Sequence, residues 1–321
     1  MNLLKECEGA KRIGISGHIR PDGDCVGSCL ALYLYLKKNM PEAVVAVYLE
    51  QPADIFGEIS GFENIVSTFP EEEKFDVYFV LDSMPDRIGD AVKYYEAAAK
   101  KINIDHHISN QGCGDVFVVR PEVGSACEVL YDLMEPEKLD KEIAMALYIG
   151  IIHDTGVFQY SNTTPDTLRK AAHLIGFGFD FPRLIEETFY QKTYLQTQLM
   201  GRVLAESNCL MNGQCTVGVA DRRTMELYGA TAKDLDGIVN QLRNVKGAHC
   251  AVFMYELADG EFKISMRSDE KVNVAEVASH FDGGGHMRAA GCTIKGDSAE
   301  CLKQVMKYIG CQLGAAEGLP G

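Results

Sequence analysis

Long hydrophobic runs are missing from this sequence. No stretch reaches roughly 18 consecutive uncharged apolar residues, the length that suggests a membrane-spanning helix. The first residues, Met1 to Glu6, have neither the basic segment nor the continuous apolar segment of a secretory signal. We therefore expect a soluble, cytoplasmic protein that is not exported and has no membrane partner.

Closely paired cysteines and excess positive charge are also missing. The eleven cysteines are an odd number without Cys-x-x-Cys pairs, and reduced thiols in a cytoplasm explain them best. Lys and Arg total 31 against 46 Asp and Glu, a formal net charge of −15. Proteins that grip long duplexes are usually basic, because counterion release supplies much of their affinity. We expect no long nucleic-acid duplex as partner, whereas a short anionic substrate remains compatible with this charge.

The chain is long enough for two domains, with 321 residues of which 46% are apolar. In its first part, expected strands alternate with a helix over Cys25 to Lys38. The expected strands are Arg12–Gly17, Val44–Leu49, Phe75–Leu81 and Lys101–Ile104. This alternation predicts an α/β fold with a mostly parallel sheet flanked by helices, in which sites lie beyond the carboxyl ends of the strands.

The second part of the chain changes character after several helices. We expect helices at Ser125–Met134 and Asp140–Ile152, another starting at Thr164, and a connecting helix at Tyr194–Glu206. Strand and helix signals then mix in a smaller α+β domain, with strands at 208–210, 215–220, 251–257 and 261–266 and helices at 234–242, 274–281 and 299–313. The expected division is 1–190, a helical linker 191–207, and 208–321, with a frayed tail from Gly314.

Side chains of metal-ligand type follow four separate apolar runs. They are His18, Asp22 and Asp24 after the first, Asp82 after the second, Asp105, His106 and His107 after the third, and His153 and Asp154 after the fourth. Each has an ordinary interpretation when taken alone: Asp24 suits a helix cap, Asp22 a turn, and Asp82 a solvated strand end. Four such coincidences are improbable, although scattered caps on an α/β scaffold remain the structural alternative.

If these side chains meet, they create a charge conflict. Four carboxylates and two imidazoles would carry too much negative charge to pack together without cations. Two divalent ions about 3.5 to 4 Å apart would resolve it. Asp and His ligands without thiolate favour manganese over a structural zinc, with magnesium, cobalt or iron as alternatives. The predicted ligands are His18, Asp22, Asp24, Asp82, His106 and Asp154.

These motifs, in their order along the chain, closely resemble the four motifs of the DHH phosphoesterases. Near the other end, residues 283–291, with the sequence GGGHMRAAG, resemble the GGGH signature of the DHHA1 domain. The resemblance implies an N-terminal DHH domain, a smaller C-terminal DHHA1 domain and an active site in the cleft between them. It also implies one metal held by His18, Asp22 and Asp82 and a second held by Asp24, Asp82, His106 and Asp154, with Asp82 bridging.

The same resemblance implies roles for the remaining motif residues. Asp105 would support the metal site from behind, and His107 would face the substrate phosphate; with Asp82 these are the predicted catalytic residues. His153 falls outside the motif and is expected to be a packed or surface histidine. Arg267 would grip the substrate, although an exposed arginine at a strand end is its ordinary interpretation, and Arg288 is a weaker candidate.

The glycine-rich segment has a physical interpretation of its own. Successive glycines allow close backbone approach, so that amides of Gly283, Gly284 and Gly285 could cradle a phosphate while His286 adds a donor. A run of glycines is also typical of a flexible turn. The apolar stretch Ala289–Cys292 behind it favours a substrate-binding loop.

The overall size resembles the stand-alone nanoRNase (NrnA-like) group of the family. That resemblance implies an enzyme in which water activated by two metals attacks phosphorus in line. Its expected substrates are very short oligoribonucleotides, degraded to mononucleotides, and 3′-phosphoadenosine 5′-phosphate (pAp), converted to AMP. One alternative is a phosphodiesterase for linear or cyclic dinucleotides such as pApA, pGpG or c-di-AMP. Another, of a different class, is a non-catalytic nucleotide-binding sensor. The sequence leaves the oligomeric state open.

Overall fold

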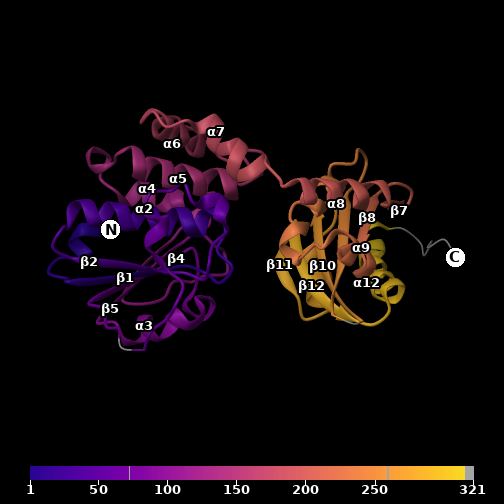
Figure 1. Ribbon diagram of the computed structural model, residues 1–321, viewed down its shortest axis with the longest axis horizontal. Coiled ribbons are helices and arrows are strands. Elements are labelled where there is room, and N and C mark those ends of the chain that lie inside the picture. Colours follow the sequence, from indigo (N-terminus) through magenta and orange to yellow (C-terminus); the bar gives the residue numbers. More distant parts are fainter. Residues whose placement is uncertain (72, 259, 315–321) are drawn as a thin grey trace. The chain divides into compact units, whose positions relative to one another are not determined.

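The computed structural model describes residues 1–71, 73–258 and 260–314. The chain divides into two compact units, Met1–Gln191 and Lys192–Gly321 (Figure 1). Each unit has its own six-stranded sheet. The tail beyond Gly314, which we expected to fray, lies outside the described residues.

A parallel sheet organises the first unit, which confirms the expected fold class. Its strands pair in the order β3-β2-β1-β4-β5-β6. The order changes direction between β1 and β4, and in open α/β sheets ligands bind beyond the carboxyl ends at such a point. The two short edge strands, β3 and β6, were not expected. The bounds are β1 Arg12–Ser16, β2 Val44–Tyr48, β3 Ile65–Val66, β4 Val77–Leu81, β5 Lys100–Asp105 and β6 Val116–Val119.

Helices cover both faces of this sheet (Figure 1). One face carries α2 Gly23–Asn39, α4 Ala126–Leu133 and α5 Lys141–Asp154, while α3 Val92–Ala97 lies on the other. The unit also contains α1 Leu3–Glu6, α6 Pro165–Ile175, α7 Phe181–Ile185 and a π-helical turn at Glu186–Tyr190. Short 3₁₀ turns occur at Asp54–Phe56, Phe62–Asn64, Pro85–Arg87, Gly89–Ala91 and Pro136–Lys138.

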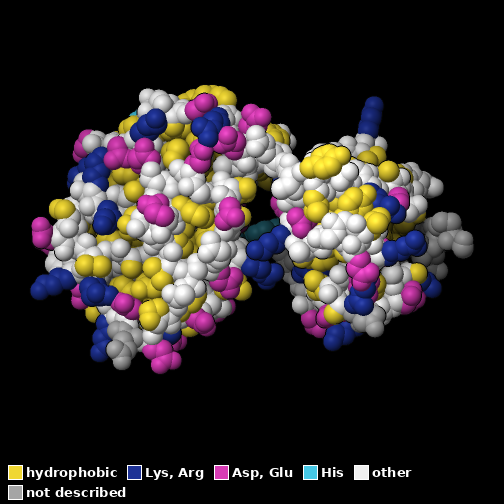
Figure 2. All heavy atoms as spheres, viewed as in Figure 1, with side chains coloured by type: hydrophobic (Ala, Val, Ile, Leu, Met, Phe, Trp, Pro, Cys, Tyr) yellow, Lys and Arg dark blue, Asp and Glu magenta, His cyan; other side chains and the backbone are white. Residues whose placement is uncertain are grey.

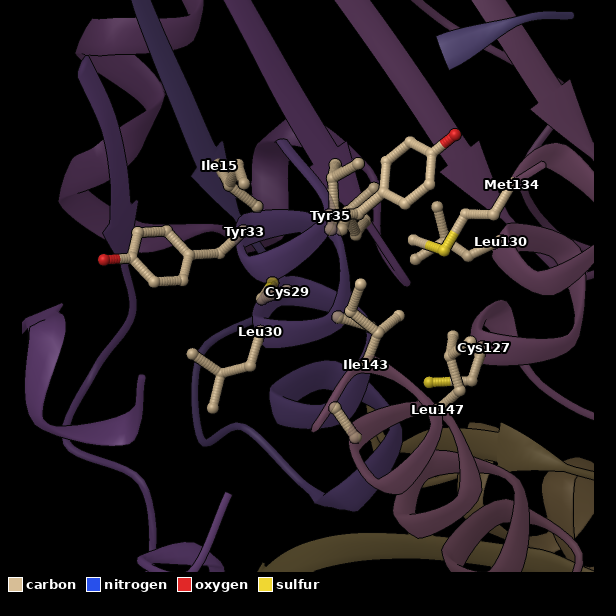
Figure 3. Close-up of a cluster of buried hydrophobic side chains, with 14 of the residues drawn as sticks. Ile15, Cys29, Leu30, Tyr33, Tyr35, Cys127, Leu130, Met134, Ile143 and Leu147 are labelled. Atoms are coloured by element: carbon tan, nitrogen blue, oxygen red, sulfur yellow. The ribbon is translucent and has the colours of Figure 1, made fainter. Parts of the chain in front are cut away.

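Strand β4 shows how the two layers are built. Its five residues are all buried, and successive side chains point to opposite faces. Phe79 and Leu81 join the large core beneath α2, α4 and α5, whereas Tyr78 and Val80 join the aromatic cluster beneath α3. Figure 3 shows part of the large core, where Ile15 of β1 lies among side chains of three helices. Burial on both faces holds the carboxyl ends of the strands in fixed positions.

The second unit contains a mixed sheet in the order β11-β12-β10-β9-β8-β7. All neighbouring strands are antiparallel except β8 and β9. The strands are β7 Asn208–Leu210, β8 Cys215–Ala220, β9 Cys250–Ala258, β10 Glu261–Ser268, β11 Gly284–His286 and β12 Ala289–Lys295. The helices are α8 Tyr194–Ala205, α9 Arg222–Tyr228, α10 Ile238–Arg243, α11 Val274–Ser279 and α12 Ser298–Leu313, with a 3₁₀ turn at Ala232–Leu235.

Two elements of this unit differ from expectation. The helix expected as a linker, α8, is part of the unit, because Leu199 and Val203 are buried in a cluster with Phe253 of β9. The helix expected over 234–242 is interrupted at Gly237, which has a φ of 83° and is the N-cap of α10. A positive φ is readily adopted by glycine but does not continue a right-handed helix.

Two further observations concern the helices and the surface charge of the described residues. Within the described part of the chain, every helix is too short or too polar to cross a membrane. On the face of the first unit shown in Figure 2, Lys and Arg side chains are interspersed with Asp and Glu.

Candidate metal centre

His18 follows the end of β1. Its Nδ1 lies 2.9 Å from the carbonyl oxygen of Ile19. A carbonyl only accepts, so in the neutral ring Nδ1 carries the proton and Nε2 is left as a lone-pair donor. That Nε2 lies 3.6 Å from Asp22 Oδ1 and 3.5 Å from Asp82 Oδ2. An imidazole whose other nitrogen is held by a carbonyl is the usual arrangement of a metal-binding histidine.

Asp22 and Asp24 lie at the start of α2, but the cap is Asp22 and not Asp24. Asp22 Oδ1 accepts hydrogen bonds from the amides of Asp24 and Cys25, both at 3.1 Å. Asp24 lies two residues further along, in the first turn of α2, and is fully buried. Its two oxygens accept the amides of Ala126 at 2.6 Å and Cys127 at 3.0 Å. The carboxylate of Asp24 therefore binds the amino end of α4 and faces the centre of the cluster.

Asp82 follows β4 and lies between the two histidines. Its Oδ2 faces His18, and its Oδ1 lies 3.4 Å from His106 Nε2. The residue is 2% exposed and has a φ of 52°, in the left-handed region that few non-glycine residues occupy. This backbone reversal at the strand end keeps the carboxylate at the edge of the sheet.

Asp105 is the last residue of β5, and His106 and His107 follow it. Asp105 Oδ1 accepts the amides of His106 at 2.7 Å and His107 at 3.1 Å, and it also lies 2.8 Å from His107 Nδ1. Because a carboxylate only accepts when ionised, His107 Nδ1 is the donor in that contact. Asp105 thus holds the backbone of both histidines and the ring of His107.

Asp154 completes the cluster as the last residue of α5. Its Oδ2 lies 3.1 Å from His106 Nε2, and Asp24 Oδ2 lies 3.9 Å from the same nitrogen. The side-chain amide of Asn162 donates to the carbonyl oxygens of Asp154 and Gly124 and so fixes the backbone at Asp154. The structure therefore brings all six predicted ligands into one region.

The ligand atoms form overlapping groups. Sets whose members offer atoms within 4.8 Å of one another are His18 with Asp22 and Asp82, Asp24 with His106 and Asp154, and Asp82 with Asp105, His106 and His107. The first set is the trio expected around one metal. The second contains three of the four residues expected around the other, and the contact of His106 with Asp82 links the two sets.

The electrostatics of the cluster show an unresolved charge conflict. Burial raises the pKa of Asp24 well above its usual value, and the charges of Asp82 and Asp154 raise it further. Burial lowers the pKa of His106, but the neighbouring carboxylates of Asp154 and Asp82 outweigh this and raise the pKa to about 12. The carboxylates therefore favour positive charge at their centre, which either protons or cations can supply.

Two buried atoms at the centre test whether a metal fits. Asp82 Oδ1 and His106 Nε2 make no hydrogen bond of acceptable geometry to any described residue. Buried polar atoms without partners are costly, and a carboxylate oxygen together with an imidazole nitrogen is a typical ligand pair for a divalent cation. Burial also raises the pKa of Cys25 and of Cys127 well above the usual range, so neither thiol supplies a thiolate. The residues fit a divalent cation bound by oxygen and nitrogen.

His153 packs inside the unit. Its ring makes edge-to-face contacts with Phe56 and Phe189, and its Nε2 lies 3.2 Å from the Thr188 hydroxyl. A Cβ at Gly23 would come within 2.2 Å of the His153 ring. The glycine between Asp22 and Asp24 is therefore required by this close approach.

The candidates of the second unit lie on β10 and β11, which both pair with β12. Arg267 is the next-to-last residue of β10 and pairs with Ala289 of β12, which in turn pairs with His286 of β11. Paired residues in a sheet point to the same face, so Arg267 and His286 share a face about 9.6 Å apart, two strand spacings. Arg267 Nη1 also donates to the Met266 carbonyl oxygen.

The glycine-rich segment is an edge strand and not the loop that we expected. Gly284–His286 pair with Ala289–Gly291 in a tight hairpin. The amide of Gly283 donates to the Ala278 carbonyl oxygen, so it is already engaged. A Cβ at Gly285, which has a φ of 144°, would lie 2.4 Å from Ala289 O, whereas a Cβ at Gly284 would meet nothing within 4 Å. Gly285 is thus needed for packing, and Gly284 leaves open space above the strand.

Comparison with known proteins agrees with this arrangement. Residues 12–151 match the DHH family, N-terminal domain, and residues 223–310 match the DHHA1 domain. The chain is 32% identical to the bifunctional oligoribonuclease and PAP phosphatase NrnA of Thermus thermophilus, over 96% of this chain and 91% of the relative. The chain belongs to the DHH/DHHA1 phosphoesterase family.

Three other proteins are also similar to this DHH/DHHA1 chain. The bifunctional oligoribonuclease and PAP phosphatase NrnA of Bacillus subtilis is 30% identical, over 86% of this chain and 87% of the relative. The crystal structure of an exopolyphosphatase-related protein from Bacteroides fragilis superposes with a TM-score of 0.88 at 25% identity, covering 97% of this chain and 96% of that one. RecJ of Thermus thermophilus in complex with Mn²⁺ shares the fold, with a TM-score of 0.54 at 14% identity over 99% of this chain and 54% of that one.

Several residues around the centre of this DHH/DHHA1 protein were missed by sequence reasoning. They are Asn103 and Asn110, which contact the ligand segments, and the amides of Ala126 and Cys127, which hold Asp24. Asn103 had a detectable signal, because it is an amide inside an otherwise apolar strand just before Asp105. The α4 amides had none, since any residue supplies an N–H.

Proposed function

We propose that this protein hydrolyses very short oligoribonucleotides to mononucleotides and removes the 3′-phosphate of pAp, with two divalent cations as cofactors and Mn²⁺ as the preferred metal. One observation supports the proposal: six carboxylate and imidazole side chains lie together at the carboxyl edge of the parallel sheet, and two of their buried atoms, Asp82 Oδ1 and His106 Nε2, have no hydrogen-bond partner among the described residues. The similarity to the NrnA relatives over nearly the whole chain supports the choice of substrate class.

The proposed ligand assignment follows the distances. His18, Asp22 and Asp82 would hold one cation, and Asp24, Asp82, His106 and Asp154 the other. Asp82 suits the shared position because its two oxygens face different histidines. When bound, the pair of cations would supply Lewis acidity that lowers the pKa of water and offsets charge on phosphoryl oxygens.

The chain's own residues would position the substrate. Asp105 holds Nδ1 of His107, so His107 would contact a substrate phosphate through Nε2. In the second unit, Arg267 and His286 present cationic or hydrogen-bonding groups on one face of the sheet, next to the open space above Gly284. A terminal phosphate or a base would be recognised by these two side chains together with the segment of Gly283, Gly284 and Gly285, except for the Gly283 amide, which already donates to Ala278. Recognition of a few charged groups suits an acidic protein better than tracking a long strand would.

A substrate-length series tests this proposal. Purified protein with Mn²⁺ is given 5′-labelled oligoribonucleotides of two to about twenty residues, pAp, pApA, pGpG, c-di-AMP and pyrophosphate, and products are resolved by chromatography. We expect the highest kcat/KM for the shortest oligoribonucleotides, together with release of phosphate from pAp. Turnover of dinucleotides alone would favour the alternative of a dinucleotide phosphodiesterase. Binding without turnover of any compound would contradict catalysis, and hydrolysis of pyrophosphate alone would contradict nuclease activity.

A further inference from the structure

A buried asparagine lies in the middle of β5. Asn103 is fully buried, and its neighbours in sequence, Ile102 and Ile104, belong to the hydrophobic core. A buried amide needs hydrogen-bond partners for both its N–H groups and its oxygen. The partners of this amide connect two of the segments that carry candidate metal ligands.

The first connection brackets Asp82. Asn103 Nδ2 donates to the carbonyl oxygen of Val80 at 3.1 Å and to that of Ser83 at 2.8 Å. These two carbonyls flank Asp82, whose φ of 52° is unfavourable for a residue with a side chain. One amide group therefore holds both ends of the backbone reversal that directs the Asp82 carboxylate.

The second connection reaches the next ligand segment through Asn110. Asn110 Nδ2 donates to Asn103 Oδ1 at 2.9 Å and to Asp105 Oδ2 at 2.6 Å. The amide of Gly112 donates to Asn110 Oδ1 at 2.8 Å, which fixes the orientation of the Asn110 side chain. Asp105 uses its other oxygen to hold the amides of His106 and His107 and the ring of His107.

We propose that Asn103 and Asn110 are positioning residues that act as one unit to hold Asp82 and the Asp105–His107 segment in ligand geometry. They touch neither substrate nor metal; they act through the residues that do. The proposal rests on the metal centre of the proposed function. It differs from a packing role because it predicts a change in metal affinity in protein that is fully folded.

The experiment compares Asn110→Ala and Asn103→Leu with wild type. Mn²⁺ binding to metal-depleted protein is measured by isothermal titration calorimetry, and kcat and KM are measured over a range of Mn²⁺ concentrations. We expect Mn²⁺ affinity about 10-fold or more weaker in each variant, the usual effect of removing a group that orients metal ligands. We also expect lost kcat to recover as Mn²⁺ is raised at a temperature well below the melting transition of each variant, where stabilisation of the fold by Mn²⁺ does not contribute.

Asn39→Ala is the matched control. Asn39 Nδ2 also donates to a backbone carbonyl, that of Tyr35, but it lies at the far end of α2, about 22 Å from Asp24 along the helix axis. It should keep wild-type Mn²⁺ affinity and kcat. Because Asn103 and Asn110 share a hydrogen bond, the double variant should bind Mn²⁺ about as weakly as the more affected single variant.

The outcomes separate this inference from the proposed function. Folded Asn110→Ala protein with wild-type Mn²⁺ affinity and wild-type kcat at low Mn²⁺ would overturn the inference, whichever substrates the wild type hydrolyses. If Asn103→Leu does not fold, Asn110→Ala alone decides. Weaker Mn²⁺ binding in the variants would support the inference even if the wild type hydrolysed none of the proposed substrates, in which case only the proposed function would fail.

Discussion

At the scale of single residues, Asp82 has three properties that are each unfavourable for the stability of the folded protein. It is almost fully buried, its backbone is left-handed, and one of its carboxylate oxygens has no hydrogen-bond partner among the described residues. Each of these is unfavourable for an isolated side chain. Their combination at the place where two groups of candidate ligands meet supports our proposal that Asp82 is the shared metal ligand.

Replacing Asp82 by Asn should abolish function without unfolding the protein. Asn adopts left-handed backbone readily and has nearly the same shape, but it lacks the charge that the proposed cations need. We expect Mn²⁺ binding by calorimetry to fall strongly and kcat/KM to fall at least about 100-fold. Asp90→Ala is the control, because Asp90 also follows β4 in sequence but is exposed. Unchanged metal content in Asp82→Asn would favour the interpretation of the acids as scattered caps.

Sequence reasoning at this scale identified ligand types but not conformations. His18, Asp82 and Asp105 were visible because each follows a strand with a clear apolar run. That Asp22 and not Asp24 caps α2 was not visible, because both have the same chemistry and lie two residues apart. The left-handed Asp82 could not be predicted either, since that conformation depends on Asn103 from a neighbouring strand.

At the scale of elements, the glycines of the β11–β12 hairpin divide into two kinds. Gly283 and Gly285 are surrounded by backbone atoms closer than a Cβ tolerates, whereas Gly284 has open space. The sequence could not separate them, because three successive glycines look alike before the strand pairing is known. We predicted a loop, which was wrong, since residues 289–291 provide a partner strand for the segment.

Single alanine substitutions separate the two kinds of glycine. Gly285→Ala should destabilise the protein by about 1 to 3 kcal/mol, because its φ is positive and its Cβ would strike Ala289 O. Gly284→Ala should leave the melting temperature unchanged and raise KM for short oligoribonucleotides, because a methyl group would occupy the space proposed for substrate. Thermal denaturation and steady-state kinetics measure both. Unchanged KM in Gly284→Ala would argue against the proposed phosphate-binding role of this segment.

Strands β1 and β4 are also joined at their amino ends by Asp76. Its Oδ2 accepts the amides of Lys11 at 2.8 Å and Arg12 at 2.9 Å. The hydrogen bonds from Arg12 and Lys11 lower the pKa of Asp76. A carboxyl whose pKa is lower in the folded state adds stability above its unfolded pKa, near 3.8 to 3.9, and loses that contribution as pH falls through the folded value.

Asp76→Ala should therefore have a pH-dependent effect. At pH 7 we expect a loss of about 1 kcal/mol in unfolding free energy, a modest value because solvent screens this exposed group. The difference from wild type should shrink as pH falls below about 4, where Asp76 itself becomes protonated. Urea denaturation at several pH values measures it. A difference that is constant over pH would show that the hydrogen bonds of the ionised form are not the cause.

At the scale of the whole molecule, all the candidate metal ligands lie in the first unit. The candidate substrate-binding residues Arg267, Gly283, Gly284, Gly285 and His286 lie in the second. Each unit has separate hydrophobic cores. The two units should therefore respond differently to metal.

Differential scanning calorimetry of the full chain tests this division. A ligand that binds only folded protein stabilises it by RT ln(1 + [L]/Kd), about 2.7 kcal/mol at a hundred times Kd. We expect Mn²⁺ to raise the melting temperature of the first unit and to leave the melting temperature of the second unit unchanged. Excess EDTA should reverse the shift. The Asp82→Asn variant should show a much smaller shift. A Mn²⁺-dependent shift of the second transition alone would contradict the assignment of the ligands.

The sequence by itself determined which residue types the centre uses and their order along the chain, because each ligand follows a locally encoded strand or helix whose hydrophobic period is visible in a short window. Only the tertiary structure decided how those residues combine. The carboxylate of Asp24 binds an amide 102 positions away in sequence, and Asn103 shapes the backbone at Asp82 from the adjacent strand. Such contacts depend on strand order and on close packing between distant segments, and no local pattern in the chain specifies either.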